Sequence, residues 1–174
     1  MDDVFAPTGS LYQLDKDLTL RKLDTGYATA NGIGISPDGK RIYVTDMRHH
    51  QIIALDYESE EGKAANRQCF AVVPDEDGMP DGLIVDSEGF VWSGHWGGWK
   101  LTRYDPSGQI ERQIKFPVEH VISFAFGHER LDQLFVTTAW WGYSDEERQQ
   151  HPWAGDIFRV EPGVRGLVEP AFDG

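Results

Sequence analysis

The chain has 174 residues, 40% of them hydrophobic and 12% aromatic, so it is long enough and apolar enough to bury the core of one domain. Its 29 acidic and 16 basic residues give a net charge of −13, which disfavours a nucleic acid partner because phosphate backbones would be repelled. The sequence has no run near the roughly 18 apolar residues of a membrane span, and its start lacks the features of a signal peptide. We therefore expect a soluble cytoplasmic protein without a membrane partner.

The first predicted elements lie in residues 9–24, "GSLYQLDKDLTLRKLD". The apolar residues of this segment favour two short strands joined by a turn. The 19 glycines and nine prolines of the chain likewise indicate many tight turns and short strands instead of long helices. This segment resembles the second half of a unit that is then repeated along the chain.

Two longer copies follow, "NGIGISPDGKRIYVTDMRHHQIIALDYE" from Asn31 and "DGLIVDSEGFVWSGHWGGWKLTRYDPSG" from Asp81. Each copy opens on Asn-Gly or Asp-Gly and continues through an apolar strand, a turn, an aromatic strand and a third strand. A looser copy, "SFAFGHERLDQLFVTTAWWG", begins near Ser123 and closes with "GDIFRVEPG". Four short antiparallel strands in each 40–50 residues are typical of a β-propeller blade. The sequence therefore predicts an all-β fold of about three and a half blades.

Within a blade, apolar residues alternate, as in Ile33 and Ile35 and again in Ile42 and Val44. Such alternation predicts strands with one buried face. The single cysteine, Cys69, lies in the apolar run "RQCFAVVP" and is expected to be a buried thiol that forms no internal disulfide.

One segment of the third copy predicts a helix between two strands. In "YSDEERQQH", Ser144 is placed to cap the helix and Glu147 to complete a capping box. The tryptophan pair just before it, Trp140-Trp141, is expected either to cap the channel mouth or to pack the insertion.

Histidines occur at two further turns. We expect His49-His50, in "DMRHHQI", to be solvated surface residues and not zinc ligands. His95 and Trp96 follow the second strand of a blade, which favours packing in the core or at the rim.

Four stretches carry a resemblance to a known family: "ANGIGISPDGKRIYVTD", "MPDGLIVDSEGFVW", "SFAFG…LDQLFVTTA" and "GDIFRVEPGVRGLVEP". Together they resemble the regucalcin, gluconolactonase and luciferin-regenerating-enzyme-like family along essentially the whole chain. The resemblance implies a six-bladed β-propeller with a divalent metal ion at the mouth of its channel. It also implies hydrolysis of a sugar lactone to a hydroxy acid.

Six blades need about 270 residues. Residues 1–174 are therefore expected to form a partial β-propeller domain from which the N-terminal blades are absent. Either the chain is the C-terminal part of a longer protein, or a second chain completes the ring.

The candidate site consists of Asn31 and Asp81, at the mouths of the first strands of adjacent blades. Asn-Gly and Asp-Gly are also common turn dipeptides, so spacing alone favours a structural role. By resemblance, both residues match metal ligands of the family, and Asp81 is the candidate catalytic general base. Asp3, or its neighbour Asp2, falls near an acidic substrate contact of the family. The family's third metal ligand, an N-terminal glutamate, has no counterpart here.

Oxygen donors of this kind accept calcium, zinc, manganese or magnesium. The expected function is divalent-metal-dependent hydrolysis of a sugar lactone, with this chain alone expected to be inactive. Two alternatives stay open, a non-catalytic propeller that binds a partner and a calcium-binding regulatory protein.

Overall fold

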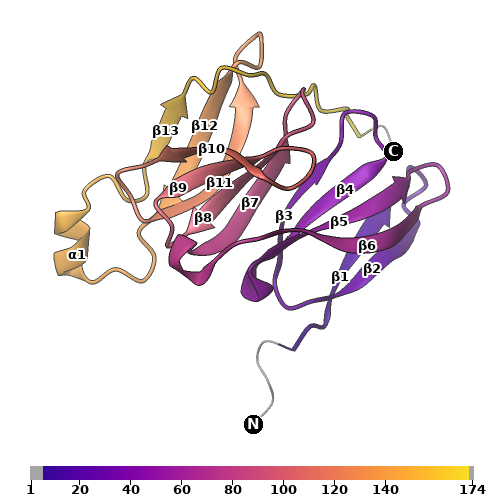
Figure 1. Ribbon diagram of the computed structural model, residues 1–174, viewed down its shortest axis with the longest axis horizontal. Helices are drawn as coiled ribbons and strands as arrows, with labels where there is room; N and C mark the ends of the chain where they lie inside the picture. The colour runs from indigo at the N-terminus through magenta and orange to yellow at the C-terminus, as the bar shows by residue number, and fades with distance from the viewer. Residues whose placement is uncertain (1–5, 173–174) are drawn as a thin grey trace.

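The fold is nearly all-β. The computed structural model describes residues 6–172, and in that range thirteen strands form four separate antiparallel sheets. The sheets lie side by side like the sectors of a fan, and the only α-helix of the described residues projects from the fourth sheet (Figure 1). The expected succession of propeller blades is therefore confirmed.

The first two sheets contain a half blade and a complete blade. Consecutive strands pair with each other in both sheets. The strands of the half blade are β1 (Gly9–Leu14) and β2 (Leu20–Tyr27). The strands of the complete blade are β3 (Ala30–Ile35), β4 (Arg41–Asp46), β5 (Gln51–Glu58) and β6 (Lys63–Val72), with the 3₁₀ helix η1 (Met47–His49) between β4 and β5.

The last two sheets repeat this arrangement. The third sheet contains β7 (Met79–Val85), β8 (Val91–Trp96), β9 (Lys100–Tyr104) and β10 (Ile110–Lys115), preceded by the 3₁₀ helix η2 (Asp75–Asp77). The fourth contains β11 (His120–Gly127), β12 (Gln133–Ala139) and β13 (Ile157–Val160), with helix α1 (Asp145–Gln150) between its last two strands. The capping box predicted for this helix is confirmed, with Ser144 and Glu147 bonded to each other's backbone N–H.

Hydrophobic clusters fill the spaces between neighbouring sheets. Tyr27 of the half blade packs with residues of the second sheet such as Leu55. Tyr43 of the second sheet packs with Leu83 and Val91 of the third, and Trp92 of the third packs with residues of the fourth. Burial of these side chains at each interface holds the blades together.

The inner strands β3, β7 and β11 run side by side at the centre of the fan (Figure 1). Glycines permit their close approach. A Cβ atom on Gly32 would lie 2.1 Å from the backbone nitrogen of Leu83, and one on Gly82 would lie 2.4 Å from the carbonyl oxygen of Ile122. The glycine of each Asn/Asp-Gly pair is therefore required by packing between blades and not by a turn.

Two burial predictions are wrong. Ile42 and Val44 are buried as expected, but Ile33 and Ile35 are exposed. These two belong to the inner strand β3 and line a hollow together with Ile84 and Val85, instead of packing in the core between sheets. The Cys69 side chain is also exposed, because β6 is the outermost strand of its sheet and most of its residues face solvent.

Within the described residues, none of the helices combines the length and the apolar character that crossing a membrane would need.

Candidate functional site

Asn31 and Asp81 occupy the same structural position in adjacent blades. The pairing of β3 with β4 shifts register between Ala30 and Ile33, and that of β7 with β8 shifts between Pro80 and Leu83. The two candidate residues therefore lie in equivalent bulges. A bulge turns a side chain away from the regular alternation of a strand. This position on an inner strand can therefore accept a polar residue.

The side chains of Asn31 and Asp81 meet each other across the two blades. Asp81 is only 5% exposed, whereas Asn31 is exposed. Burial raises the pKa of Asp81 to about 6, and a hydrogen bond from the Asn31 side-chain amide opposes part of this rise. Within residues 6–172, Asp81 forms no ion pair with a lysine or an arginine. The pair thus consists of a partly desolvated carboxylate and a neighbouring amide.

A buried carboxylate on β4 fixes the backbone just before Asn31. Asp46 is fully buried, and its Oδ1 accepts hydrogen bonds from the backbone N–H groups of Ala28 (3.2 Å) and Thr29 (3.3 Å). Its Oδ2 lies 2.7 Å from Nδ1 of His49. Sequence reasoning missed this role of Asp46, because its partners Ala28 and Thr29 are distant in the sequence. His49 is exposed, as expected, whereas His50 is only partly exposed and its Nδ1 atom is buried.

The donor types of the pair fit a hard divalent cation, since both residues present an oxygen donor and the carboxylate lacks a cationic partner. The pair supplies two ligands at most. Residues 6–172 contain no group of three or more His, Cys, Asp or Glu side chains arranged to hold a metal ion. Any cation bound here would therefore need further ligands from water, substrate or other chain segments. Asp2 and Asp3 lie outside the described residues.

Aromatic side chains cluster at the end of the third and fourth sheets where β8 ends and β11 begins. Trp96, at the end of β8, stacks on His120, at the start of β11, with ring centroids 3.9 Å apart and planes 10° apart. Trp141 lies against Trp96 at 5.9 Å. Trp140 instead packs within the insertion, under the guanidinium of Arg148. Packing of the insertion is thus confirmed for Trp140, and capping of the channel mouth by Trp141 stays a prediction.

His95 is 1% exposed and belongs to the interior, as its position in the blade predicted. Its Nδ1 lies 2.9 Å from the carbonyl oxygen of Asp77, so this nitrogen carries the proton and donates. Its Nε2 is buried without a hydrogen-bond partner among the described residues.

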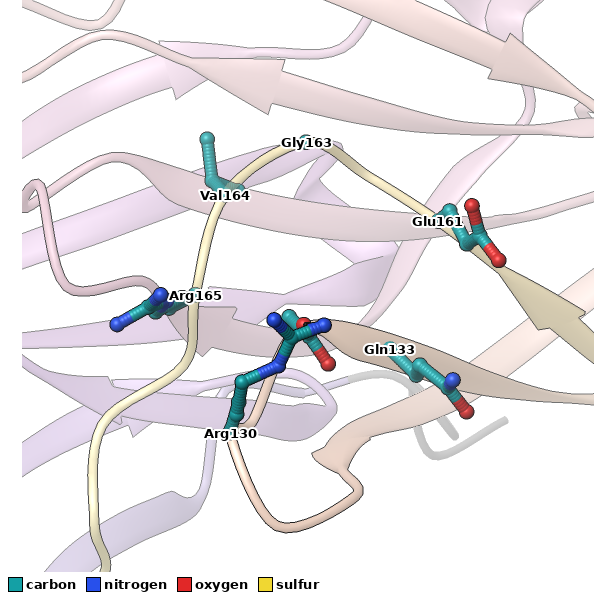
Figure 2. Close-up of a pocket in the computed structure, with 7 residues that line it drawn as sticks. Arg130, Gln133, Glu161, Gly163, Val164 and Arg165 are labelled. Atoms are coloured by element: carbon teal, nitrogen blue, oxygen red, sulfur yellow. Dashed lines mark ion pairs between the residues drawn. The ribbon is translucent and has the colours of Figure 1, made fainter.

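A separate hollow of about 370 Å³ lies beside the fourth sheet, and Figure 2 shows residues that line it. The turn between β11 and β12 and the segment after β13 line it, with Arg130, Glu161 and Arg165 among the lining residues. β11 leads from His120, near the candidate site, to Gly127, near this hollow. The hollow therefore does not belong to the Asn31–Asp81 site.

Comparison with known proteins identifies the family. Residues 1–165 match the family described as SMP-30/Gluconolactonase/LRE-like region. The chain belongs to this family. It is 37% identical to L-arabinolactonase of Azospirillum brasilense over 95% of its own length, and 35% identical to pentonolactonase XacC of Haloferax volcanii over 92%.

Solved structures of the SMP-30/gluconolactonase family show the same fold. Regucalcin from Agrobacterium tumefaciens, described as a calcium-binding protein, superposes with a TM-score of 0.90 at 25% identity, over 98% of this chain and 58% of that one. A gluconolactonase from Xanthomonas campestris superposes with a TM-score of 0.64 at 31% identity, over 74% of this chain and 41% of that one.

The chain spans a little more than half of these SMP-30/gluconolactonase relatives, 55% of the arabinolactonase and 57% of the pentonolactonase.

Proposed function

We propose that this chain forms the part of a divalent-metal-dependent sugar lactonase that contains Asn31 and Asp81. The equivalent bulges that place Asn31 and Asp81 at the same end of the packed inner strands β3 and β7 are the observation that carries the proposal. Relatives named pentonolactonase and L-arabinolactonase support a sugar lactone as the substrate class.

The position of Asp81, buried near the start of the inner strand β7, supports a role for its carboxylate as the general base. With a pKa of about 6, the carboxyl group is mostly ionised near pH 7 and still basic enough to accept a proton. Water attacks the carbonyl carbon of the lactone, and Asp81 takes the proton that the water loses. The bond between the carbonyl carbon and the ring oxygen then breaks, and the ring oxygen receives that proton as it becomes a hydroxyl group.

Asn31 orients this carboxylate. The amide lowers the pKa of Asp81, and its nitrogen donates to Sδ of Met47 (3.7 Å), which leaves the amide oxygen available for a cation or for the substrate. When bound, a divalent cation would supply Lewis-acid stabilisation of the charge that develops on the lactone carbonyl. Asp46 would hold Asn31 in place through the backbone of Ala28 and Thr29.

The decisive experiment measures lactone hydrolysis by the full-length protein with Ca²⁺, Zn²⁺, Mn²⁺ or Mg²⁺ added after chelation. We expect turnover to require one of these ions, and Asp81→Ala to reduce kcat by about a hundredfold or more. Undiminished turnover of Asp81→Ala in the presence of metal would remove Asp81 from the mechanism.

Asn31 is tested by cation binding. Asn31→Ala should weaken cation binding in calorimetry by about tenfold or more. Asn66 provides a matched control, because its amide also donates to a carboxylate, that of Asp56 at 2.7 Å, on a different part of the sheet. Asn66 has a φ of 51°, so Asn66→Gly keeps its backbone relaxed. Equal effects of the two substitutions would contradict a role for Asn31 as a ligand.

A calcium-binding regulatory role is the second candidate, supported by the similarity to a regucalcin described as calcium-binding. It would use the same pair of residues. Tight Ca²⁺ binding that depends on Asp81, together with no turnover of any pentono- or hexonolactone, would favour this role over the enzyme. A propeller that only binds a partner would retain that binding in Asp81→Ala.

A further inference from the structure

One contiguous aromatic cluster contains Trp96, His120, Trp141 and Tyr143, and it continues through His151 to Trp99. Trp96 stacks on His120, Trp141 leans on Trp96 with centroids 5.9 Å apart, and Tyr143 lies 5.5 Å from His120. We call Trp96, His120, Trp141 and Tyr143 the aromatic platform. Its members come from β8, β11 and the insertion between β12 and β13, which places residues distant in the sequence side by side.

The platform lies at the same rim of the blades as Asp81. Trp96 pairs with Met79 on the adjacent strand β7, two residues before Asp81. His120 is the first residue of β11, and two residues later the carbonyl of Ile122 packs against Gly82, the neighbour of Asp81. The platform and the Asn31–Asp81 pair are therefore at the same ends of neighbouring inner strands.

Hydrogen bonds anchor the insertion that carries Trp141. The Tyr143 hydroxyl donates to Glu119 Oε2 (3.0 Å), and Ser144 and Glu147 close a capping box at the start of α1. The other end of the insertion is bonded to Thr138, whose hydroxyl donates to the carbonyl oxygen of Asp156 (2.8 Å). A binding surface that is already ordered loses little entropy when a ligand arrives.

Trp141 is 73% exposed although it contacts a partly buried aromatic ring. An indole held in solvent beside a carboxylate site offers a flat apolar face for the C–H groups of a sugar ring. The Glu119 carboxylate, beside the Tyr143 hydroxyl, offers hydrogen-bond acceptors for the sugar hydroxyls. This combination of one apolar face and a few polar groups suits a cyclic sugar better than a plain alkyl lactone.

From this geometry we infer that Trp141, supported by Trp96, stacks against the ring of the sugar lactone and determines specificity for sugar lactones. The inference rests on the proposed lactonase function and assigns a substrate-positioning role to a residue of the insertion. The lactone ring would lie between the platform and Asp81, with its carbonyl toward the carboxylate and its C–H face toward the indole.

Kinetics of the full-length protein test this inference. Trp141→Ala should raise KM for pentono- and hexonolactones about tenfold with little change in kcat, and Trp141→Phe should restore most of the loss. Neither substitution should alter hydrolysis of γ-butyrolactone, which has no sugar hydroxyl groups. Trp153, which is 55% exposed in the same insertion and is not part of the platform, provides the matched control Trp153→Ala. An unchanged KM for sugar lactones in Trp141→Ala, or an equal rise for γ-butyrolactone, would overturn the inference.

Binding without turnover separates this inference from the proposed function. Glucono- and arabinonolactams keep the sugar ring but replace the ester with an amide that resists hydrolysis. Saturation-transfer NMR should detect either lactam on the wild-type protein and on Trp153→Ala, with the signal lost in Trp141→Ala. Lactam binding that depends on Trp141 without lactone turnover would reject the lactonase proposal and keep the platform. Lactam binding that is unaffected by Trp141→Ala, or absent from the wild-type protein, would reject the platform.

Discussion

The Asp81 carboxyl group lies close enough to the Asn31 side chain for that amide to lower its pKa, although about 50 residues separate the two in the sequence. The contact exists because Gly32 and Gly82, which follow them, bring the inner strands β3, β7 and β11 close together. The same packing that joins the blades therefore assembles the candidate site.

The buried carboxyl group of Asp81 should make the metal-free protein less stable as the pH rises. Its pKa increases from an ordinary value of 3.8 to about 6 on folding, so the folded state holds the proton more tightly. The resulting stability is fully present below pH 3.8 and is lost as the pH rises through 6. This loss is about 3 kcal/mol at most. Urea unfolding in a chelator at pH 8 should thus show Asp81→Asn to be more stable than the wild type, and a parallel pH dependence of the two proteins would contradict the prediction.

His95 should have the opposite effect on stability, which it should lower as the pH falls. Burial lowers the pKa of this imidazole from 6.5 to about 4, so its contribution to stability is present above pH 6.5 and is lost as the pH falls through 4. The His95→Asn variant keeps a donor for the carbonyl of Asp77 but cannot titrate. Its free energy of unfolding should fall less steeply between pH 6.5 and 4 than that of the wild type. An equal slope in both proteins would show that His95 does not titrate with this shift.

Gly82→Ala should separate the inner strands. The added Cβ would lie 2.4 Å from the carbonyl oxygen of Ile122, a clash with backbone that only a movement of β7 or β11 can relieve. We expect a loss of about 2 kcal/mol or more in the free energy of unfolding, together with weaker cation binding. Gly39→Ala is the control, since a Cβ there meets nothing within 4 Å and only its φ of 72° is unfavourable. That control should cost about 1 kcal/mol and leave cation binding unchanged.

Arg103 should be the most costly charged residue to remove from the third sheet. Its side chain is 2% exposed and donates to Asp86 (2.8 Å) and Glu88 (2.7 Å). Arg103→Ala would leave the fully buried Asp86 carboxylate without this cation, at a cost of about 3–5 kcal/mol.

Arg112 serves for comparison with Arg103, because its ion pair with Glu111 is exposed and Arg112→Ala should cost about 1 kcal/mol or less. Chemical denaturation measures both substitutions. An equal loss in the free energy of unfolding for the two substitutions would show that burial does not decide how much each arginine contributes to stability.

The repeated strand pattern was enough to predict the blades and to select Asn31 and Asp81 as equivalent residues. The half blade of β1 and β2 and the capping box of α1 were also predictable, because each rests on residues close together in the sequence. The family was predictable from motifs spread along the chain. The role of Asp46 was not predicted, since its carboxylate accepts hydrogen bonds from backbone N–H groups that are far away in the sequence. The exposure of Cys69 depends likewise on which strand ends the sheet.

By itself, the sequence determined the strand periodicity, the turns and the identity of two oxygen donors, since these depend on local backbone preferences and on repetition. Only the tertiary structure decided that Asp81 is buried beside Asn31, that Ile33 is exposed, and that Trp141 lies on Trp96 at the same rim. The physical reason is that burial and pKa depend on which surfaces neighbouring blades cover, and strands distant in the sequence provide that cover.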